Sequence, residues 1–129
     1  MREEATKWWK QALEDLDTAK YNASGKKYYA AAFFCHQAVE KALKALYLAR
    51  ERELPGRTRS LIALARKLEV PQRYHRFLKE LTAEYVVSRY PNATDEIPAA
   101  LYGPEILEDY IRRSEEVLRW VEEELRKIG

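Results

Sequence analysis

Apolar residues recur every three or four positions along most of the chain, which is the spacing of a buried stripe on an α-helix. The stripes predict helices over residues 2–22, 28–50, 60–68, 72–87 and from 104 to the end of the chain. No segment shows the alternation of Val, Ile and Thr that is typical of a strand. We therefore expect an all-α fold, an antiparallel up-and-down bundle of four to five helices that forms one domain over residues 1–129.

Helix-breaking and capping residues set the expected boundaries. Ser24 and Gly25 end the first helix, and Thr58 or Ser60 is the expected N-cap of the third. Residues 88–103 are predicted to be irregular, because two prolines and a glycine lie within them.

The helix over residues 28–50 is apolar on most sides, which predicts a central position or a helix shared with a second subunit. Five polar residues interrupt it: His36, Gln37, Glu40, Lys41 and Lys44. His36 and Glu40 are four residues apart, as are Glu40 and Lys44, so each pair lies on one face of the helix. Polar groups on a buried helix need partners. Both a satisfied network within the bundle and a ligand site fit this cluster.

Composition excludes several classes of protein. The chain has 129 residues, of which 47% are hydrophobic, and a single cysteine, which excludes a disulfide scaffold. No apolar run approaches the roughly 18 residues that cross a bilayer, and the N-terminal segment has no apolar signal core. We expect a cytoplasmic protein that does not associate with a membrane.

The charge is distributed unevenly. The formal net charge is +2, yet residues 41–79 hold eleven basic and three acidic side chains, a net of +8. Such a segment creates a positive field that attracts phosphates or an acidic partner. A solvated helical surface rich in Arg and Lys explains the same numbers.

No familiar metal or phosphate motif is present. The two histidines and the cysteine lack the spacing of metal ligands, and four glycines are too few for a glycine-rich phosphate loop. The paired carboxylates lie on charged helix faces. We therefore expect no metal and no cofactor.

A second distinctive segment follows the fourth predicted helix. Arg89 stands at its end and is followed by Tyr90, Pro91 and Asn92. An arginine in this position can present its guanidinium to a phosphate. Alternatively, Arg89 binds helix carbonyls or pairs with Glu84.

Together these two segments resemble the HEPN family, the higher eukaryote and prokaryote nucleotide-binding domain. Residues 37–45 read Gln-Ala-Val-Glu-Lys-Ala-Leu-Lys-Ala, which is similar to the Gln-Ala-x-Glu-Lys-Ala-x-Lys-Ala core of the second helix of that family. Residues 88–91 resemble the Arg-Tyr-Pro segment of a bacterial and archaeal branch. Residues 58–61 stand where many members have a His-Ser/Asp-Leu turn.

The resemblance implies an up-and-down bundle that is usually a homodimer. It also implies a partner, because stand-alone members are often encoded beside a minimal nucleotidyltransferase, in pairs that include toxin–antitoxin modules. Many HEPN proteins are metal-independent ribonucleases. In them an Arg, followed after four to six residues by a His, promotes attack of the RNA 2′-hydroxyl on the adjacent phosphate.

The sequence departs from that ribonuclease motif, because both of its histidines, His36 and His75, precede Arg89. The motif therefore lacks the group that would carry the proton. The sequence predicts a module that binds a nucleotide or a partner protein, and an RNA endonuclease toxin centred on Arg89 is the alternative. The expected ligand-binding residues are Arg89, Tyr90, Asn92, Glu40, Lys41, Lys44 and His36.

Overall fold

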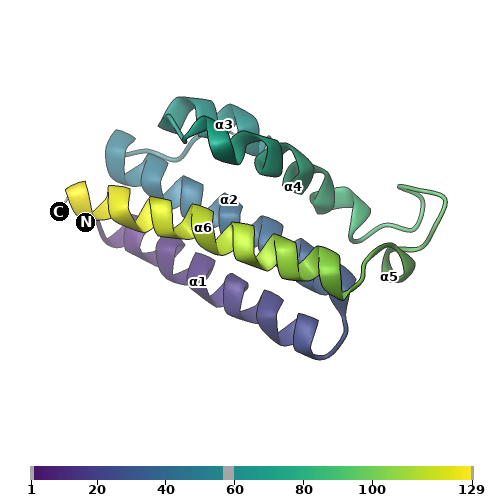
Figure 1. The fold of residues 1–129 in the computed structure, drawn as a ribbon. Helices are drawn as coiled ribbons and strands as arrows, with labels where there is room; N and C mark the ends of the chain where they lie inside the picture. Colours follow the sequence, from purple (N-terminus) through teal and green to yellow (C-terminus); the bar gives the residue numbers. More distant parts are fainter. Residues whose placement is uncertain (1, 57–59, 129) are drawn as a thin grey trace.

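Within residues 2–56 and 60–128, which this computed structural model describes, the chain forms six α-helices, one 3₁₀ turn and no strand (Figure 1). These elements are α1 (Glu3–Ser24), α2 (Tyr28–Glu51), α3 (Leu61–Leu68), η1 (Gln72–Tyr74), α4 (His75–Val87), α5 (Pro98–Leu101) and α6 (Pro104–Ile128). The predicted all-α bundle is confirmed. None of the described helices combines the length and the apolar character needed to cross a membrane.

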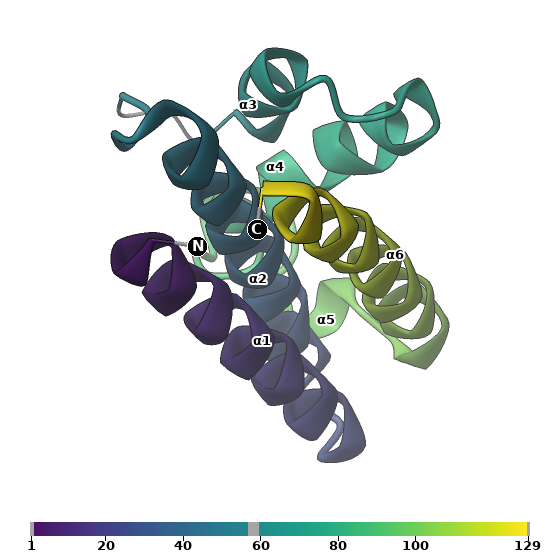
Figure 2. The same cartoon turned by 90° about the vertical axis from the view of Figure 1, so that its left-hand side faces the viewer.

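The helix α2 lies at the centre of the bundle. It packs against α1, α6, α4 and α3, and Figures 1 and 2 show α1 on one side of it and the α3–α4 pair on the other. Small side chains allow close packing against α1, because Ala5, Ala12 and Ala19 are fully buried there. The larger members of the core, such as Leu43 and Leu46 of α2, fill the space between the helices.

The helix boundaries predicted for the first, second, third and last helices agree with the structure to within about two residues. Ser60 is the N-cap of α3, since its hydroxyl accepts a hydrogen bond from the N–H of Ala63 at 3.2 Å. The other expected N-cap, Thr58, lies outside the described residues.

Two local predictions were wrong. The first turn of the predicted fourth helix is the 3₁₀ turn η1, in which the N–H of Tyr74 donates to the carbonyl of Pro71 at 3.0 Å. The short helix α5 lies within residues 88–103, which we expected to be irregular. Pro98 begins α5, where its fixed φ suits a first helical turn.

We expect Leu43→Ala to lower the free energy of unfolding by about 2–5 kcal/mol, because it removes a fully buried side chain from the central helix. Ile106→Ala is the matched control, since Ile106 is 43% exposed, and it should cost less than about 1 kcal/mol. Urea unfolding followed by circular dichroism measures both values. Similar losses in the two variants would contradict the placement of α2 in the core.

Candidate functional site

The guanidinium of Arg89 rests on three aromatic rings just beyond the end of α4. Its Cζ atom lies 4.2 Å from the centre of the Tyr85 ring and 4.9 Å from the ring centres of both Phe33 and Tyr90. Its Nε–H donates to the carbonyl of Tyr85 at 2.7 Å. We call these four residues the Arg89 cluster. The cluster holds the guanidinium in a fixed place at an exposed position.

Two helices position this cluster. Phe33 and His36 are three residues apart on α2, so they share the face that packs against α4. The centre of the Tyr85 ring lies 6.3 Å from the Phe33 ring and 5.5 Å from the His36 ring. His36 is fully buried, and its Nδ1 lies 3.2 Å from Nε2 of Gln37. His36 therefore supports the Tyr85 ring from inside the bundle.

The carboxylate nearest to Arg89 in sequence is engaged elsewhere. Glu84 is buried and accepts hydrogen bonds from the hydroxyls of Tyr102 and Tyr110, the latter at 3.0 Å. Arg89 instead binds the Tyr85 carbonyl, as one of the two structural interpretations predicted. Among residues 2–56 and 60–128, no carboxylate forms an ion pair with Arg89. Its terminal nitrogens are therefore available to an anion from solution.

Burial controls the protonation of the groups behind the cluster. Loss of solvent raises the pKa of Glu84 above its ordinary value, and the two tyrosine hydroxyls oppose that shift only in part. Burial, together with the neighbouring Glu84, raises the pKa values of Tyr102 and Tyr110. Burial also raises the pKa of the Cys35 thiol to about 12, which keeps the thiol protonated and inert.

The remaining polar residues of α2 lie at the seam with α1. Lys41 forms a salt bridge with the buried Asp15, and Nζ of Lys44 lies 3.7 Å from Glu40 and 5.6 Å from the centre of the Trp8 ring. The predicted Glu40–Lys44 pair is thus present. A shallow cavity of about 220 Å³ lies beside this seam, and Lys41 contributes to its lining.

The structure therefore divides the predicted site residues into two groups. Tyr90 and His36 lie with Arg89 on the α4 side of α2, whereas Lys41 and Lys44 lie on the α1 side. Asn92 is exposed in the turn after Tyr90.

The sequence did not predict that three aromatic rings hold Arg89. Tyr85 precedes Arg89 by four residues, which is the spacing of neighbours on one helix face, so this contact could have been found. Phe33 lies 56 positions away on α2, and only tertiary packing brings it to the cluster. No sequence pattern near Glu84 predicts that two tyrosines from the last third of the chain bind its carboxylate.

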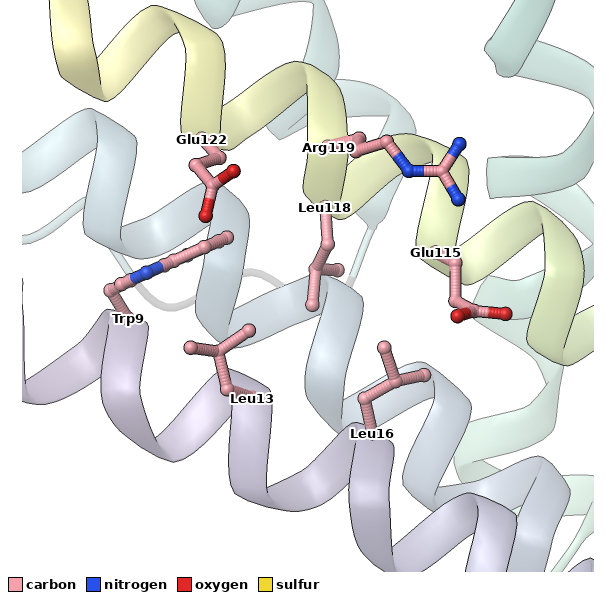
Figure 3. A pocket seen from close by; sticks show the side chains of 7 residues that line it. All are labelled: Trp9, Leu13, Leu16, Glu115, Leu118, Arg119 and Glu122. Atoms are coloured by element: carbon pink, nitrogen blue, oxygen red, sulfur yellow. The ribbon is translucent and has the colours of Figure 1, made fainter.

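A second hollow lies between α1 and α6 (Figure 3). Its volume is about 140 Å³, and Leu13, Leu16 and Leu118 form its apolar floor. The acidic residues at its edge are paired, Glu115 with Lys20 at 3.0 Å and Glu122 with Arg126 at 3.2 Å. It contains none of the predicted site residues. In the part of the chain that the structure describes, no cluster of three or more potential metal ligands occurs.

The fold and the site define a small helical-bundle protein in which an arginine is held on aromatic rings beyond the end of α4. The HEPN domain matches residues 5–124, and the chain belongs to the HEPN domain family.

Two solved structures share the fold over nearly their whole length. TT1696 from Thermus thermophilus is 30% identical, with a TM-score of 0.86 and coverage of 95% of this chain and 99% of its own. ST0689, an archaeal HEPN homologue, is 29% identical, with a TM-score of 0.81 and coverage of 97% of this chain and 99% of its own. The comparison with curated proteins finds no match.

The raised pKa of Glu84 predicts a pH-dependent stability. Because the folded pKa lies above the unfolded value of about 4.3, the folded chain keeps a proton that the unfolded chain releases as the pH rises. Ionisation of Glu84 therefore lowers the free energy of unfolding by an amount that grows as the pH rises from about 4.3 through the folded pKa. Well below this pH the carboxyl is protonated in both states and this loss is absent. Glu84→Gln removes this titration and keeps a hydrogen-bonding side chain of the same shape.

We expect the free energy of unfolding of Glu84→Gln, relative to the natural chain, to increase as the pH is raised from 4.5 to 7.5. Urea titrations at several pH values in this range measure the difference. A constant difference, or a relative gain by the natural chain as the pH rises, would show that Glu84 does not carry the buried charge.

Proposed function

We propose that this HEPN protein is a nucleotide-binding module in which Arg89 receives a phosphate group of the ligand. One observation carries the proposal: the Arg89 guanidinium is held by three rings and a carbonyl, while no described carboxylate neutralises it. Membership of the HEPN family, whose members act on nucleotides or RNA, supports it.

The geometry of Arg89 suits a phosphate. Nε is occupied by the Tyr85 carbonyl, so the two terminal nitrogens remain as a planar pair of donors that matches two phosphate oxygens. Stacking on the rings limits the conformational freedom that the side chain would lose on binding. Tyr90 is 48% exposed and offers part of its ring to a base, and the amide of Asn92 lies in the following turn.

We propose binding rather than ribonucleolytic cleavage because neither histidine is placed to transfer a proton beside Arg89. His36 contacts the cluster through Tyr85 but is fully buried. His75 begins α4, fourteen residues before Arg89, or roughly 20 Å along the chain at the helical rise. Its Nε2 lies 2.8 Å from the carbonyl of Val70.

The partners belong to the same proposal. We propose that the chain forms a homodimer and acts with a minimal nucleotidyltransferase in a pair of the toxin–antitoxin type, as the resemblance to stand-alone HEPN proteins implies. Light scattering during size-exclusion chromatography tests the dimer, which should elute with twice the 15.2 kDa mass of one chain. Co-purification with the product of the neighbouring reading frame tests the nucleotidyltransferase.

Arg89→Ala should weaken the binding of ATP at least about tenfold, because a charge-assisted hydrogen bond contributes about 1.5–3 kcal/mol. Arg89→Lys keeps the charge but loses the planar pair of donors, so its affinity should be intermediate. Isothermal titration calorimetry of the natural chain and both variants measures these affinities.

Arg119→Ala is the control for the loss of one positive charge, because Arg119 is exposed on α6 and lies outside the Arg89 cluster. It should leave the affinity for ATP within about twofold. No detectable binding of ATP by the natural chain, or equal losses in Arg89→Ala and Arg119→Ala, would remove the basis of the proposal.

A single-stranded RNA should remain intact when it is incubated with the protein in the absence of metal ions, since no accessible imidazole lies beside Arg89. Gel electrophoresis of an end-labelled RNA over several hours measures cleavage. Cleavage that is lost in Arg89→Ala would instead establish the endonuclease alternative.

A further inference from the structure

A groove rich in arginine lies away from the Arg89 cluster, where η1 and α4 meet α3 on one side and α6 on the other. It consists of two adjoining cavities, of about 390 and 270 Å³, and Arg76 lines both. We call it the basic groove and define it by its six cationic side chains. They are Arg66, Arg73, Arg76, Lys79, Arg112 and Arg113.

Most of this positive charge is not neutralised. The side chain of Arg76 is 91% exposed, and its contact with Glu80 is at the 4.0 Å limit for an ion pair. Arg66, Arg73 and Lys79 are exposed, and none of them forms an ion pair with any acidic residue that the structure describes. These four residues therefore create a positive field over the groove.

On the α6 side of the groove, acidic residues neutralise part of the positive charge. Arg112 and Arg113 share the carboxylate of Asp109, at 2.7 and 3.1 Å, and Arg112 also lies 3.4 Å from Glu116. These ion pairs hold the two guanidiniums in place at the edge of the larger cavity. Their residual attraction for an anion is weaker than that of Arg73 and Arg76.

Aromatic rings lie among these cations. Cζ of Arg73 lies 4.6 Å from the centre of the Tyr74 ring, and Cζ of Arg113 lies 5.9 Å from that of Phe77. Tyr74 is half-buried, so part of its ring and the flat face of Arg73 remain open to the groove. Arginine guanidiniums and aromatic rings stack on nucleobases, and the positive charges of such a groove attract the phosphates of the backbone.

We propose that the basic groove binds the backbone of a single-stranded nucleic acid. The cations are spread over four elements along two joined cavities, which suits a chain of phosphates better than a single phosphate group. Five of the six are arginines, and their stacking with aromatic rings favours a nucleic acid over an acidic protein segment, which has no planar bases to stack.

The basic groove is separate from the nucleotide site proposed above. Arg76 and Arg89 are thirteen residues apart, about 20 Å along α4 and its C-terminal turn. The two sites can therefore be tested independently.

The test is fluorescence anisotropy with a fluorescein-labelled 20-nucleotide RNA and a DNA of the same sequence, at several salt concentrations. The double variant Arg73→Ala with Arg76→Ala should bind both at least tenfold more weakly than the natural chain. The slope of log Kd against log salt should fall by about 1.4, because each lost phosphate contact removes about 0.7. Binding of only one of the two nucleic acids would assign the ligand as RNA or as DNA.

The matched control is Arg2→Ala with Lys10→Ala. This variant removes the same charge from α1 and its N-terminal flank, on the opposite side of α2 from α3 and α4 (Figures 1 and 2). It should change the affinity less than about twofold. All substituted side chains are exposed, so the circular dichroism of the variants should match that of the natural chain.

Three outcomes would overturn the proposal. The first is no binding of either oligonucleotide at 50 mM salt. The second is an equal loss of affinity in the groove variant and the α1 control. The third is displacement of the RNA by polyglutamate at an equal concentration of charges, which would assign the groove to an acidic protein instead.

Discussion

Burial of α2 over most of its circumference is the constraint on which the rest of the structure depends. A helix that is apolar on most sides is stable in water only when other helices cover those sides. Here α1 and α6 cover part of α2 and the α3–α4 pair covers another part, while a stripe through Phe33, Gln37, Glu40, Lys44 and Tyr47 stays partly exposed. The alanines of α1 and α2 let these two helices pack closely.

This constraint decides what the polar residues of α2 can do. His36 points to α4 and lies under Tyr85, whereas Lys41 points to α1 and pairs with Asp15. The same helix therefore serves two surfaces that share no side chain. The surface at α4 ends in an arginine with free donor groups, and the seam at α1 is closed by its own ion pairs. This difference is why the proposed phosphate site lies at Arg89.

The fold could be read from the sequence because helical stripes and capping residues are local signals. As expected, Ser60 is the N-cap of α3, and α1 ends at Ser24 and Gly25. The site could be read only in part. Arg89 and Tyr90 stand out in sequence, but Phe33 reaches them through the packing of α2 on α4, and no spacing rule predicts it. Lys41 and Lys44 lie on the α1 side of α2 rather than beside Arg89, because His36 and Lys41 are five residues apart and point to different sides of the helix.

The structure shows where most of the basic residues of segment 41–79 lie in the fold. Several of its basic residues gather on α3, η1 and α4, where they meet Arg112 and Arg113 of α6. A net charge of +2 thus hides both a groove with excess positive charge and a single arginine held on aromatic rings. Two sites of this kind would let one small domain hold a nucleotide and a nucleic acid at the same time.

We propose that Arg89 is held in place before any ligand arrives and receives a phosphate without rearrangement. The most direct measurement is the side-chain Nε–Hε signal of Arg89 in ¹H–¹⁵N NMR spectra, assigned by its disappearance in Arg89→Lys. We expect a signal protected from exchange with water in the free protein, because Nε–H donates to the Tyr85 carbonyl. We also expect this signal to shift and saturate as ATP is added. A signal that exchanges as fast as those of exposed arginines, or one that ATP leaves unchanged, would show that Arg89 is not a preformed phosphate site.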